Sequence, residues 1–196
     1  TSNDEKGVSY RDDESSNVTE AKLIAKTLTN INLQMKQQGY HSKNKQKVGV
    51  VSFYQSQCRT IRDEIRKANG GKLDFEAIHV EINTVIRYQG KEKPIILISL
   101  VRNDGKPKEY RRSSRANIAR FEFINVAMSR AQNLLMVFGA RNMLELRDVN
   151  LPNMDKPGTS KRKIYQDIFN RLEREGQVCT AREFIQACEI SKPQMA

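Results

Sequence analysis

Short apolar segments that alternate with helix-like stretches constrain the fold of this chain more than any other feature of its sequence. The apolar segments are residues 48–53, 78–82, 95–102 and 134–138. Before and between them lie stretches whose apolar residues recur at three- and four-residue spacing, as in amphipathic helices. Near-continuous apolar strands that alternate with helices are typical of a parallel sheet with both faces covered. The sequence therefore predicts an α/β fold with a mainly parallel sheet.

The helical stretches carry start and stop signals. Asn17 and Glu20 are spaced as a capping pair, and the helix that they open is expected to run to about Lys36. A second helix is expected over residues 56–69, where Gly70-Gly71 stops it. A short early strand and three later helical segments complete the prediction, at residues 7–10, 142–146, 164–176 and 181–188.

Positive charge is the main signal in the composition. Lys and Arg number 34 against 23 Asp and Glu, which gives a formal net charge of +11. Such an excess attracts a polyanion without choosing a sequence, so single-stranded RNA or DNA is an expected partner. The excess is densest in a loop at residues 102–120, inserted between a strand and a helix. A nucleic-acid contact and a solvated surface loop both remain open for this insertion.

Membrane and metal-binding classes are not predicted. No apolar stretch approaches the roughly 20 residues of a membrane span, and no signal peptide is recognisable. We expect no membrane partner and a cytoplasmic location, or a nuclear one in a eukaryote. The three cysteines and two histidines show no paired metal spacing, so neither disulfides nor a metal site is expected. The chain begins at Thr1 without a methionine, which suggests a fragment of a longer protein.

A Gln-Gly-x-Glu sequence lies in the loop at residues 84–92, after the second apolar segment. Gly90 lets the backbone approach a ligand closely, while Gln89 and Glu92 present polar groups at fixed offsets. A ribose hydroxyl is a suitable partner for the Glu92 carboxylate. A plain turn between two strands is the alternative interpretation.

Arg130 lies near the end of the helical stretch that precedes the last apolar segment. The apolar residues of this stretch are expected to face the core, and they are Phe121, Ile124, Met128 and Ala131. Their spacing places Arg130 in the last turn of the helix. A cation at a helix C-terminus is favoured by the helix dipole, so Arg130 taken alone needs no further role.

Residues 84–92 and 125–131 together resemble motifs V and VI of superfamily 1 helicases, in the branch that includes senataxin and the nonsense-decay RNA helicase. The resemblance implies the second RecA-like motor domain of such an enzyme. This is an α/β domain of the P-loop NTPase type, with helices on both faces of a mainly parallel sheet.

The resemblance also implies roles for particular residues. ATP with Mg²⁺ would be the cofactor, and Gln89, Gly90 and Glu92 would contact the nucleotide. Arg130 would be the catalytic residue, because its guanidinium would reach the γ-phosphate and stabilise charge that develops during transfer.

A nucleic-acid interface is implied as well. Helicases of this branch carry a Ser/Thr-Pro-Tyr-x-x-Gln sequence, which this chain matches with Ser52, Tyr54 and Gln57 and departs from at Phe53. We expect these residues at the carboxyl ends of the strands, where doubly wound sheets bind ligands. A packing role for Tyr54 remains open. The other nucleic-acid candidates are Thr84, Arg102, Arg111, Arg112 and Arg115.

The chain departs from the family pattern within both motifs. Ile86 stands in place of an aspartate, Tyr88 in place of a phenylalanine, and Phe123 in place of the first of two arginines. Arg120, one helical turn before Phe123, could substitute only if the helix begins early enough. The chain also contains no Gly-x-x-x-x-Gly-Lys-Ser/Thr loop and no adjacent Asp-Glu pair at the end of a strand. The phosphate cradle and magnesium ligands would therefore come from an upstream RecA-like P-loop domain of the same polypeptide.

We predict a polar lead-in, a RecA-like domain with the basic insertion, a linker and a helical extension, at residues 1–6, 7–149, 150–160 and 161–196. Two functions remain open. In one, the chain is half of an ATP-dependent helicase or translocase, which hydrolyses ATP only in the full-length protein. In the other, it is a degenerate RecA-like module that binds nucleic acid or a partner without catalysis. RNA and DNA both remain open as ligands.

Overall fold

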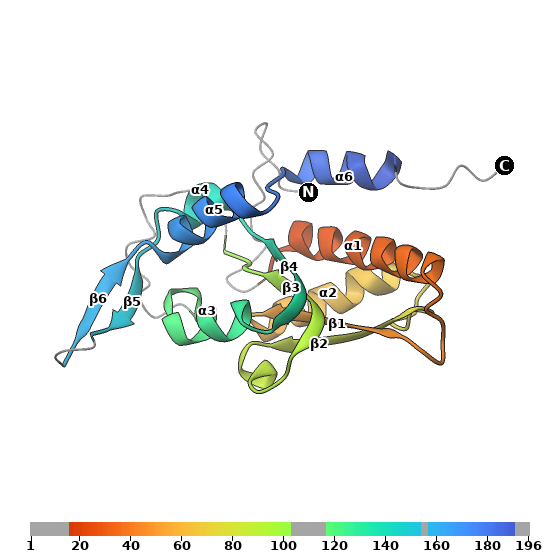
Figure 1. The fold of residues 1–196 in the computed structure, drawn as a ribbon, viewed down its shortest axis with the longest axis horizontal. Helices are drawn as coiled ribbons and strands as arrows, with labels where there is room; N and C mark the ends of the chain where they lie inside the picture. Colours follow the sequence, from red (N-terminus) through yellow and green to blue (C-terminus); the bar gives the residue numbers. More distant parts are fainter. Residues whose placement is uncertain (1–15, 103–116, 154–156, 191–196) are drawn as a thin grey trace.

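A four-stranded parallel sheet organises the computed structural model, which describes residues 16–102, 117–153 and 157–190 (Figure 1). The strands lie in the order β2-β1-β3-β4, and every neighbouring pair is parallel. Their bounds are β1 Gln46–Ser52, β2 Ile78–Thr84, β3 Lys93–Ser99 and β4 Ala131–Phe138. The predicted α/β fold is confirmed.

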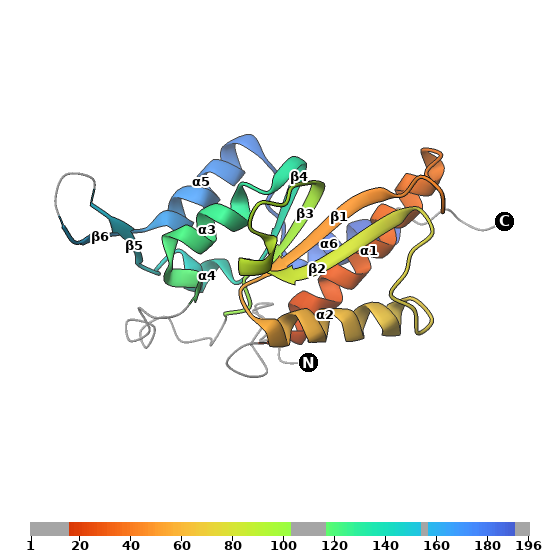
Figure 2. The same ribbon diagram turned by 90° about the horizontal axis from the view of Figure 1, so that it is seen from below.

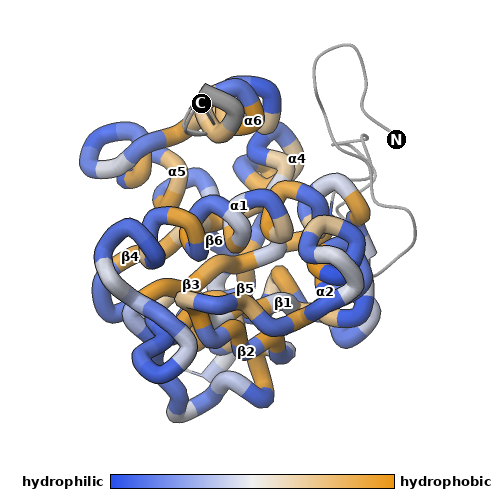
Figure 3. Tube along the Cα trace, turned by 90° about the vertical axis from the view of Figure 1, so that its right-hand side faces the viewer, coloured by the Kyte–Doolittle hydropathy of each residue, from blue (hydrophilic) through white to orange (hydrophobic). Residues whose placement is uncertain are grey.

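Helices cover both faces of this sheet. α1 (Val18–Gln37) and α2 (Gln55–Ala68) pack on one face, and α3 (Phe121–Met128) packs on the other. Side chains alternate between the faces along each strand, so Val50 joins the hydrophobic cluster under α1 and α2 while Val51 joins the cluster under α3. Figure 3 shows hydrophobic stretches along the strands below α1.

The predicted ends of α1 and α2 are confirmed. Asn17 is the N-cap of α1, and its side-chain oxygen accepts a hydrogen bond of 3.0 Å from the Glu20 N–H. Gly70 and Gly71 follow α2 with φ angles of 57° and 82°, a conformation that stops a helix. Local sequence therefore determines where α1 begins and where α2 ends.

The last strand of the sheet differs from its prediction. We expected residues 134–138 to form a buried strand, but β4 is an edge strand of the four-stranded sheet and Leu134 is 45% exposed. An edge strand has a neighbour on one side, so side chains that a central strand would bury stay partly open. An apolar run does not by itself distinguish the two positions.

Residues 150–160, predicted as a linker, contain paired strands instead. β5 (Val149–Pro152) pairs antiparallel with β6 (Thr159–Arg162), and the hairpin projects from the rest of the molecule (Figure 2). The prolines suggested an irregular connection. Pro152 lies at the end of β5, however, where the missing N–H interrupts no central ladder.

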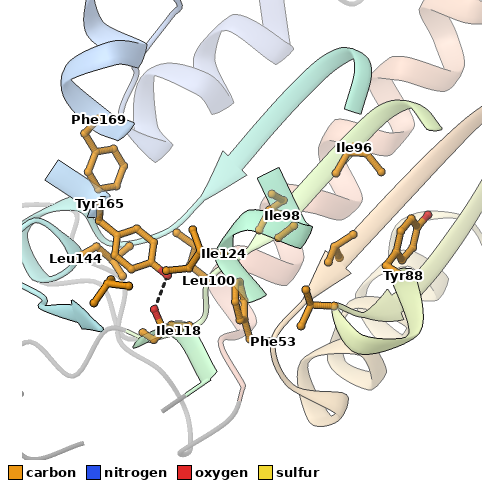
Figure 4. Packing of buried hydrophobic residues seen from close by; sticks show 14 of the residues in the cluster. Phe53, Tyr88, Ile96, Ile98, Leu100, Ile118, Ile124, Leu144, Tyr165 and Phe169 are labelled. Atoms are coloured by element: carbon orange, nitrogen blue, oxygen red, sulfur yellow. Dashed lines mark hydrogen bonds between the residues drawn. The ribbon is translucent and has the colours of Figure 1, made fainter. Parts of the chain in front are cut away.

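The helix after the hairpin belongs to the hydrophobic core. α5 (Ile164–Glu175) buries Tyr165 completely, and the Tyr165 hydroxyl donates a hydrogen bond of 2.8 Å to the Ile118 carbonyl (Figure 4). Phe169 of α5 joins the same cluster, together with Leu144 of α4 (Arg141–Leu144). Side chains from the predicted extension thus complete the core beside α3.

α6 (Ala181–Ile190) lies over α1 on the outside of the molecule (Figure 1). Phe184 of α6 meets Phe138 at the end of β4 edge to face, with ring centres 6.4 Å apart. Within the described ranges, no helix is both long and apolar enough to cross a membrane. The strand predicted at residues 7–10 and residues 103–116 of the basic insertion lie outside the described residues.

Candidate functional site

The residues predicted to contact a nucleotide lie at the edge of the sheet where β3 and β4 begin. Residues 89–92 connect the short 3-10 helix η1 (Ile86–Tyr88) to β3. Arg130 directly precedes β4, and its carbonyl accepts a hydrogen bond of 3.1 Å from the N–H of Lys93, the first residue of β3. Pairing of β3 with β4 therefore brings the two motifs together at what we call the amino edge.

The loop at the amino edge is open to a ligand. Gly90 has a φ of 76°, and no atom lies within 4 Å of the place where a Cβ would be. The side chains of Gln89 and Glu92 are exposed. An accessible backbone lets a bound sugar approach closely, and the carboxylate beside it can accept hydrogen bonds from the hydroxyl groups of the sugar.

Tyr88 anchors this loop to the sheet. Its ring is fully buried, and its hydroxyl donates a hydrogen bond of 3.4 Å to the Glu81 carbonyl. Burial raises the pKa of the Tyr88 phenol. The hydroxyl occupies space beside Gly49, where a Cβ would lie 2.2 Å from the hydroxyl oxygen. Gly49 thus accommodates the extra oxygen that distinguishes Tyr88 from the family's phenylalanine.

Two lysines tie the loop to β2. Lys91 and Lys93 stand on either side of Glu92, and both ammonium groups pair with the Glu81 carboxylate. The hydrogen bond from Lys91 is the main reason that the pKa of Glu81 is lowered. The chain is therefore held on both sides of Glu92 while the Glu92 side chain stays exposed.

Arg130 follows α3 instead of lying in its last turn. The helix ends at Met128, with Ser129 as the C-cap residue. The Arg130 guanidinium turns back onto this helix end, where Nε donates to the Val126 carbonyl at 3.0 Å and Nη2 donates to the Ser129 hydroxyl at 2.8 Å. A cation here satisfies a C-terminal carbonyl and complements the helix dipole. In this structure Arg130 is both a helix-end cation and a neighbour of the Gln-Gly-x-Glu loop.

Arg120 is the N-cap residue of α3, so the helix does not begin early enough to place it one turn before Phe123 within the helix. Its guanidinium nevertheless stacks on Phe123, with the guanidinium carbon 4.3 Å from the ring centre. The Arg120 guanidinium therefore lies against the ring of Phe123, the residue that replaces the family's first arginine.

The opposite end of the sheet, which we call the carboxyl edge, brings Tyr54 and Arg102 together. Tyr54 follows β1 as the N-cap residue of α2, and Arg102 follows β3. Arg102 Nε donates a hydrogen bond of 3.0 Å to the Tyr54 hydroxyl, and its guanidinium carbon lies 5.5 Å from the ring centre. Thr84 ends β2 in the same register row as Ser52 and is half-buried.

Ser52 and Gln57 are fully buried at the carboxyl edge. The Gln57 amide accepts a hydrogen bond of 2.7 Å from the Asn17 N–H and donates bonds of 3.1 Å to the Asn17 carbonyl and 3.0 Å to the Ser99 hydroxyl. These bonds hold the start of α1 against α2 and β3. Neither side chain is exposed at the surface, and their contact with nucleic acid stays a prediction. Arg111, Arg112 and Arg115 lie outside the described residues.

Glu20 is a buried carboxylate at the carboxyl edge that sequence reasoning did not single out as a site residue. It is 3% exposed, and its Oε2 accepts hydrogen bonds of 2.6 Å from the Ser99 hydroxyl and 3.0 Å from the Val101 N–H. Burial raises the pKa of Glu20 to about 7, although these hydrogen bonds act in the opposite direction. The Asn-x-x-Glu-Ala sequence that opens α1 resembles a helix start common in this helicase branch. It is a weak signal for Glu20, because the same spacing is explained by capping alone.

The parallel sheet, its two helical layers and the loops at its amino edge define a RecA-like α/β domain. A family model described as "AAA domain" matches residues 1–142, and the chain belongs to that family. Among the residues that the structure describes, no group of three or more His, Cys, Asp or Glu side chains could hold a metal ion.

Several helicases are similar to this chain. It is 35% identical to "Helicase SEN1" of Saccharomyces cerevisiae over 98 residues, which are 50% of this chain and 4% of that protein. It is 33% identical over 132 residues to the "DNA replication ATP-dependent helicase/nuclease DNA2" of Mus musculus, and these residues are 66% of this chain and 10% of that protein. The human protein of the same name is 34% identical over 126 residues, which are 63% of this chain and 10% of that protein. The chain is thus a RecA-like domain of the superfamily 1, senataxin-like helicases, and it spans a tenth or less of these relatives.

Proposed function

We propose that this chain is the second motor domain of an ATP-dependent superfamily 1 helicase or translocase. In this proposal it completes an ATP cleft whose P-loop and Asp-Glu pair belong to an upstream RecA-like domain of the same polypeptide. The observation that carries the proposal is the meeting of residues 89–92 and Arg130 at the amino edge, joined through the hydrogen bond from Lys93 to Arg130.

The exposed groups of the amino edge suit a nucleotide. The Glu92 carboxylate can accept a hydrogen bond from a ribose hydroxyl, and the open backbone at Gly90 lets the sugar approach. Magnesium bound with ATP would offset the phosphate charge and would take its protein ligands from the upstream domain. Arg130 would exchange its contacts with Val126 and Ser129 for the γ-phosphoryl group, whose developing charge its guanidinium can stabilise.

Single-stranded RNA or DNA is the proposed ligand of the carboxyl edge. Tyr54 offers an aromatic ring and Arg102 a guanidinium, the two kinds of group that bind single strands without reading sequence. The net charge of +11 supports the same ligand. Binding should therefore weaken steeply as salt rises. Salt-insensitive binding would contradict this electrostatic account.

The second candidate is a degenerate module that binds nucleic acid or a partner without catalysis. Two observations favour it. Ile86 is 60% exposed at the position where the family has an aspartate, and Arg130 is engaged by its own helix end. An upstream P-loop domain in the same polypeptide would argue against this candidate.

Arg130→Lys in the intact polypeptide separates the two candidates. Lysine keeps the charge at the helix end but loses the guanidinium fork, so stability and nucleic-acid binding should change little. Nucleic-acid-stimulated ATP hydrolysis should fall by a factor on the order of 10³, as loss of an arginine finger commonly does. Arg171→Lys, at an exposed residue of α5, is the matched control. Normal hydrolysis by Arg130→Lys, or loss that follows a lower melting temperature, would refute the catalytic role.

A further inference from the structure

The chain turns sharply at Val101, directly after β3. Val101 has a φ of 69°, and among the described residues it is the one non-glycine residue with positive φ. The Arg102 N–H donates a hydrogen bond of 2.7 Å to the Leu100 carbonyl, two residues back. Together these features define a γ-turn of the positive-φ kind, which is rare and is especially unfavourable for a β-branched residue. Such a conformation persists where its surroundings hold it in place.

Two buried side chains hold this turn from both sides. Glu20 accepts the Val101 N–H at 3.0 Å, and the Asn17 amide donates a hydrogen bond of 3.2 Å to the Val101 carbonyl. Gln57 fixes Asn17 in turn by bonding to its N–H and its carbonyl. Both polar groups of the strained residue are therefore engaged by side chains that are themselves buried.

The direction of the turn decides where Arg102 points. The Arg102 side chain leaves the turn toward Tyr54, where its Nε bonds to the hydroxyl and its guanidinium stacks over the ring. A guanidinium fixed through Nε still carries N–H donors on its two Nη atoms, and these donors match the oxygens of a phosphate. An extended backbone at Val101 would carry Arg102 away from Tyr54.

We propose that Glu20 and Asn17 are positioning residues for nucleic-acid binding. They hold Val101 in its left-handed conformation and thereby present the Arg102 guanidinium, backed by Tyr54, to a phosphate of single-stranded RNA or DNA. This inference rests on the nucleic-acid binding proposed above and deepens it.

Glu20→Gln in the full chain is the main test, because it keeps the size of the side chain while weakening its hold on the Val101 N–H. Affinity for short oligo(dT) and oligo(U), measured by fluorescence anisotropy, should fall about fivefold, the size of one lost surface charge contact. The slope of binding against salt should decrease by about one, and Arg102→Ala should show the same two changes. The double variant should fall no further than Arg102→Ala alone.

Charge alone predicts the opposite result. At pH 8, where Glu20 is mostly ionised, Glu20→Gln removes a negative charge from a basic protein, which would strengthen the attraction of a polyanion. Glu64→Gln is the matched control, since Glu64 is also a buried carboxylate and lies on α2 away from the turn. The affinity of the Glu64→Gln variant for the oligonucleotides should stay unchanged or rise slightly.

Val101→Gly tests the link between the cluster and Arg102. Glycine adopts a positive φ without the Cβ clash, so the turn should form with less help from Glu20. The Glu20→Gln/Val101→Gly double variant should therefore regain most of the affinity that Glu20→Gln alone loses. Loss in the double variant equal to that in Glu20→Gln would show that Glu20 does not act through Val101.

A readout without nucleic acid separates this inference from the proposed function. In Glu20→Gln the Val101 amide should exchange with solvent about tenfold faster or more, and the NMR signal of the Arg102 Nε–H should shift. An unchanged Arg102 signal, or unchanged affinity and salt slope, would overturn the positioning role. If wild type binds neither oligonucleotide while the Val101 amide still loses protection, the proposed binding fails and the phosphate role of Arg102 fails with it.

Discussion

The two edges of the sheet are built differently. At the amino edge the polar groups of Gln89 and Glu92 are exposed, and Arg130 is held by a carbonyl and a hydroxyl of its own helix end. At the carboxyl edge the polar side chains are almost completely buried and bonded to one another, namely Asn17, Glu20, Ser52, Gln57 and Ser99. One edge presents groups that can change partners, whereas the other fixes the backbone from which Tyr54 and Arg102 emerge.

This difference predicts that substitutions at the two edges will have different consequences. An exposed group that is available to a ligand contributes little to folding stability, so its loss should appear in binding or turnover. A buried polar group leaves its partners unsatisfied when it is removed, so its loss should appear first in stability. The following experiments test this separation, from the largest expected effect to the smallest.

Glu92→Ala should weaken ATP binding by the intact polypeptide about ten- to a hundredfold, because one hydrogen bond to a charged group is lost. Nucleic-acid binding and the melting temperature should stay close to wild type. Titration with a fluorescent ATP analogue measures the effect, and Glu175→Ala on the exposed side of α5 is the control. Unchanged nucleotide affinity would return Glu92 to the interpretation as a turn residue.

Gln57→Ala should lower the free energy of unfolding by about 1–3 kcal/mol, because the buried N–H of Asn17 loses its acceptor. Urea denaturation of the chain measures this change. Gln55→Ala, at the exposed first residue of α2, should shift stability by no more than about 0.5 kcal/mol. Equal effects of the two substitutions would show that the carboxyl edge is not fixed by its buried bonds.

Stability should fall as pH rises from about 5 to about 8, because the pKa of Glu20 is raised by burial to about 7 in the folded chain. Below the ordinary carboxyl pKa the contribution of Glu20 is fully present, and it is lost as pH rises through the folded value. The groups that contact its carboxylate, from Asn17, Ser99 and Val101, are neutral.

Urea midpoints across this pH range measure the fall, which should be on the order of 1–2 kcal/mol. Glu20→Gln should flatten it. Carboxylates with lowered pKa values, such as Glu81, act in the opposite direction and at lower pH, so they do not account for a fall in this range. The same slope in wild type and Glu20→Gln would assign the effect to another group.

Ser129→Ala should have the smallest effect. It removes one of the two contacts of the Arg130 guanidinium and leaves the bond to the Val126 carbonyl in place. ATP turnover by the intact polypeptide should change by about twofold or less, because the contact is exposed. A loss approaching that of Arg130→Lys would show that Ser129 itself takes part in the cleft.

Periodicity predicted the parallel sheet, α1 and α2, because these depend on local patterns. The meeting of residues 89–92 with Arg130 at the amino edge became visible only in the structure, because it depends on the pairing of β3 with β4. Periodicity missed the exposure of β4, since an apolar run does not report how many neighbours a strand has. It also missed the role of Glu20. A capping spacing explains the Asn17–Glu20 pair locally, while the bonds from Ser99 and Val101 come from residues about eighty positions away.

Tyr165 limits where the polypeptide can be shortened without disrupting the folded domain. The family match ends at residue 142, yet the Tyr165 ring fills the core beside Ile124 (Figure 4). Its hydroxyl donates a hydrogen bond to the carbonyl of Ile118, which lies in the short 3-10 helix Asn117–Ala119 before α3. A polypeptide shortened at the family boundary would leave a large void and a buried carbonyl without its donor. The hairpin and α5 should therefore unfold together with the sheet in one cooperative step. The position of Arg130, the proposed catalytic residue that follows α3, would then depend on residues beyond the family match.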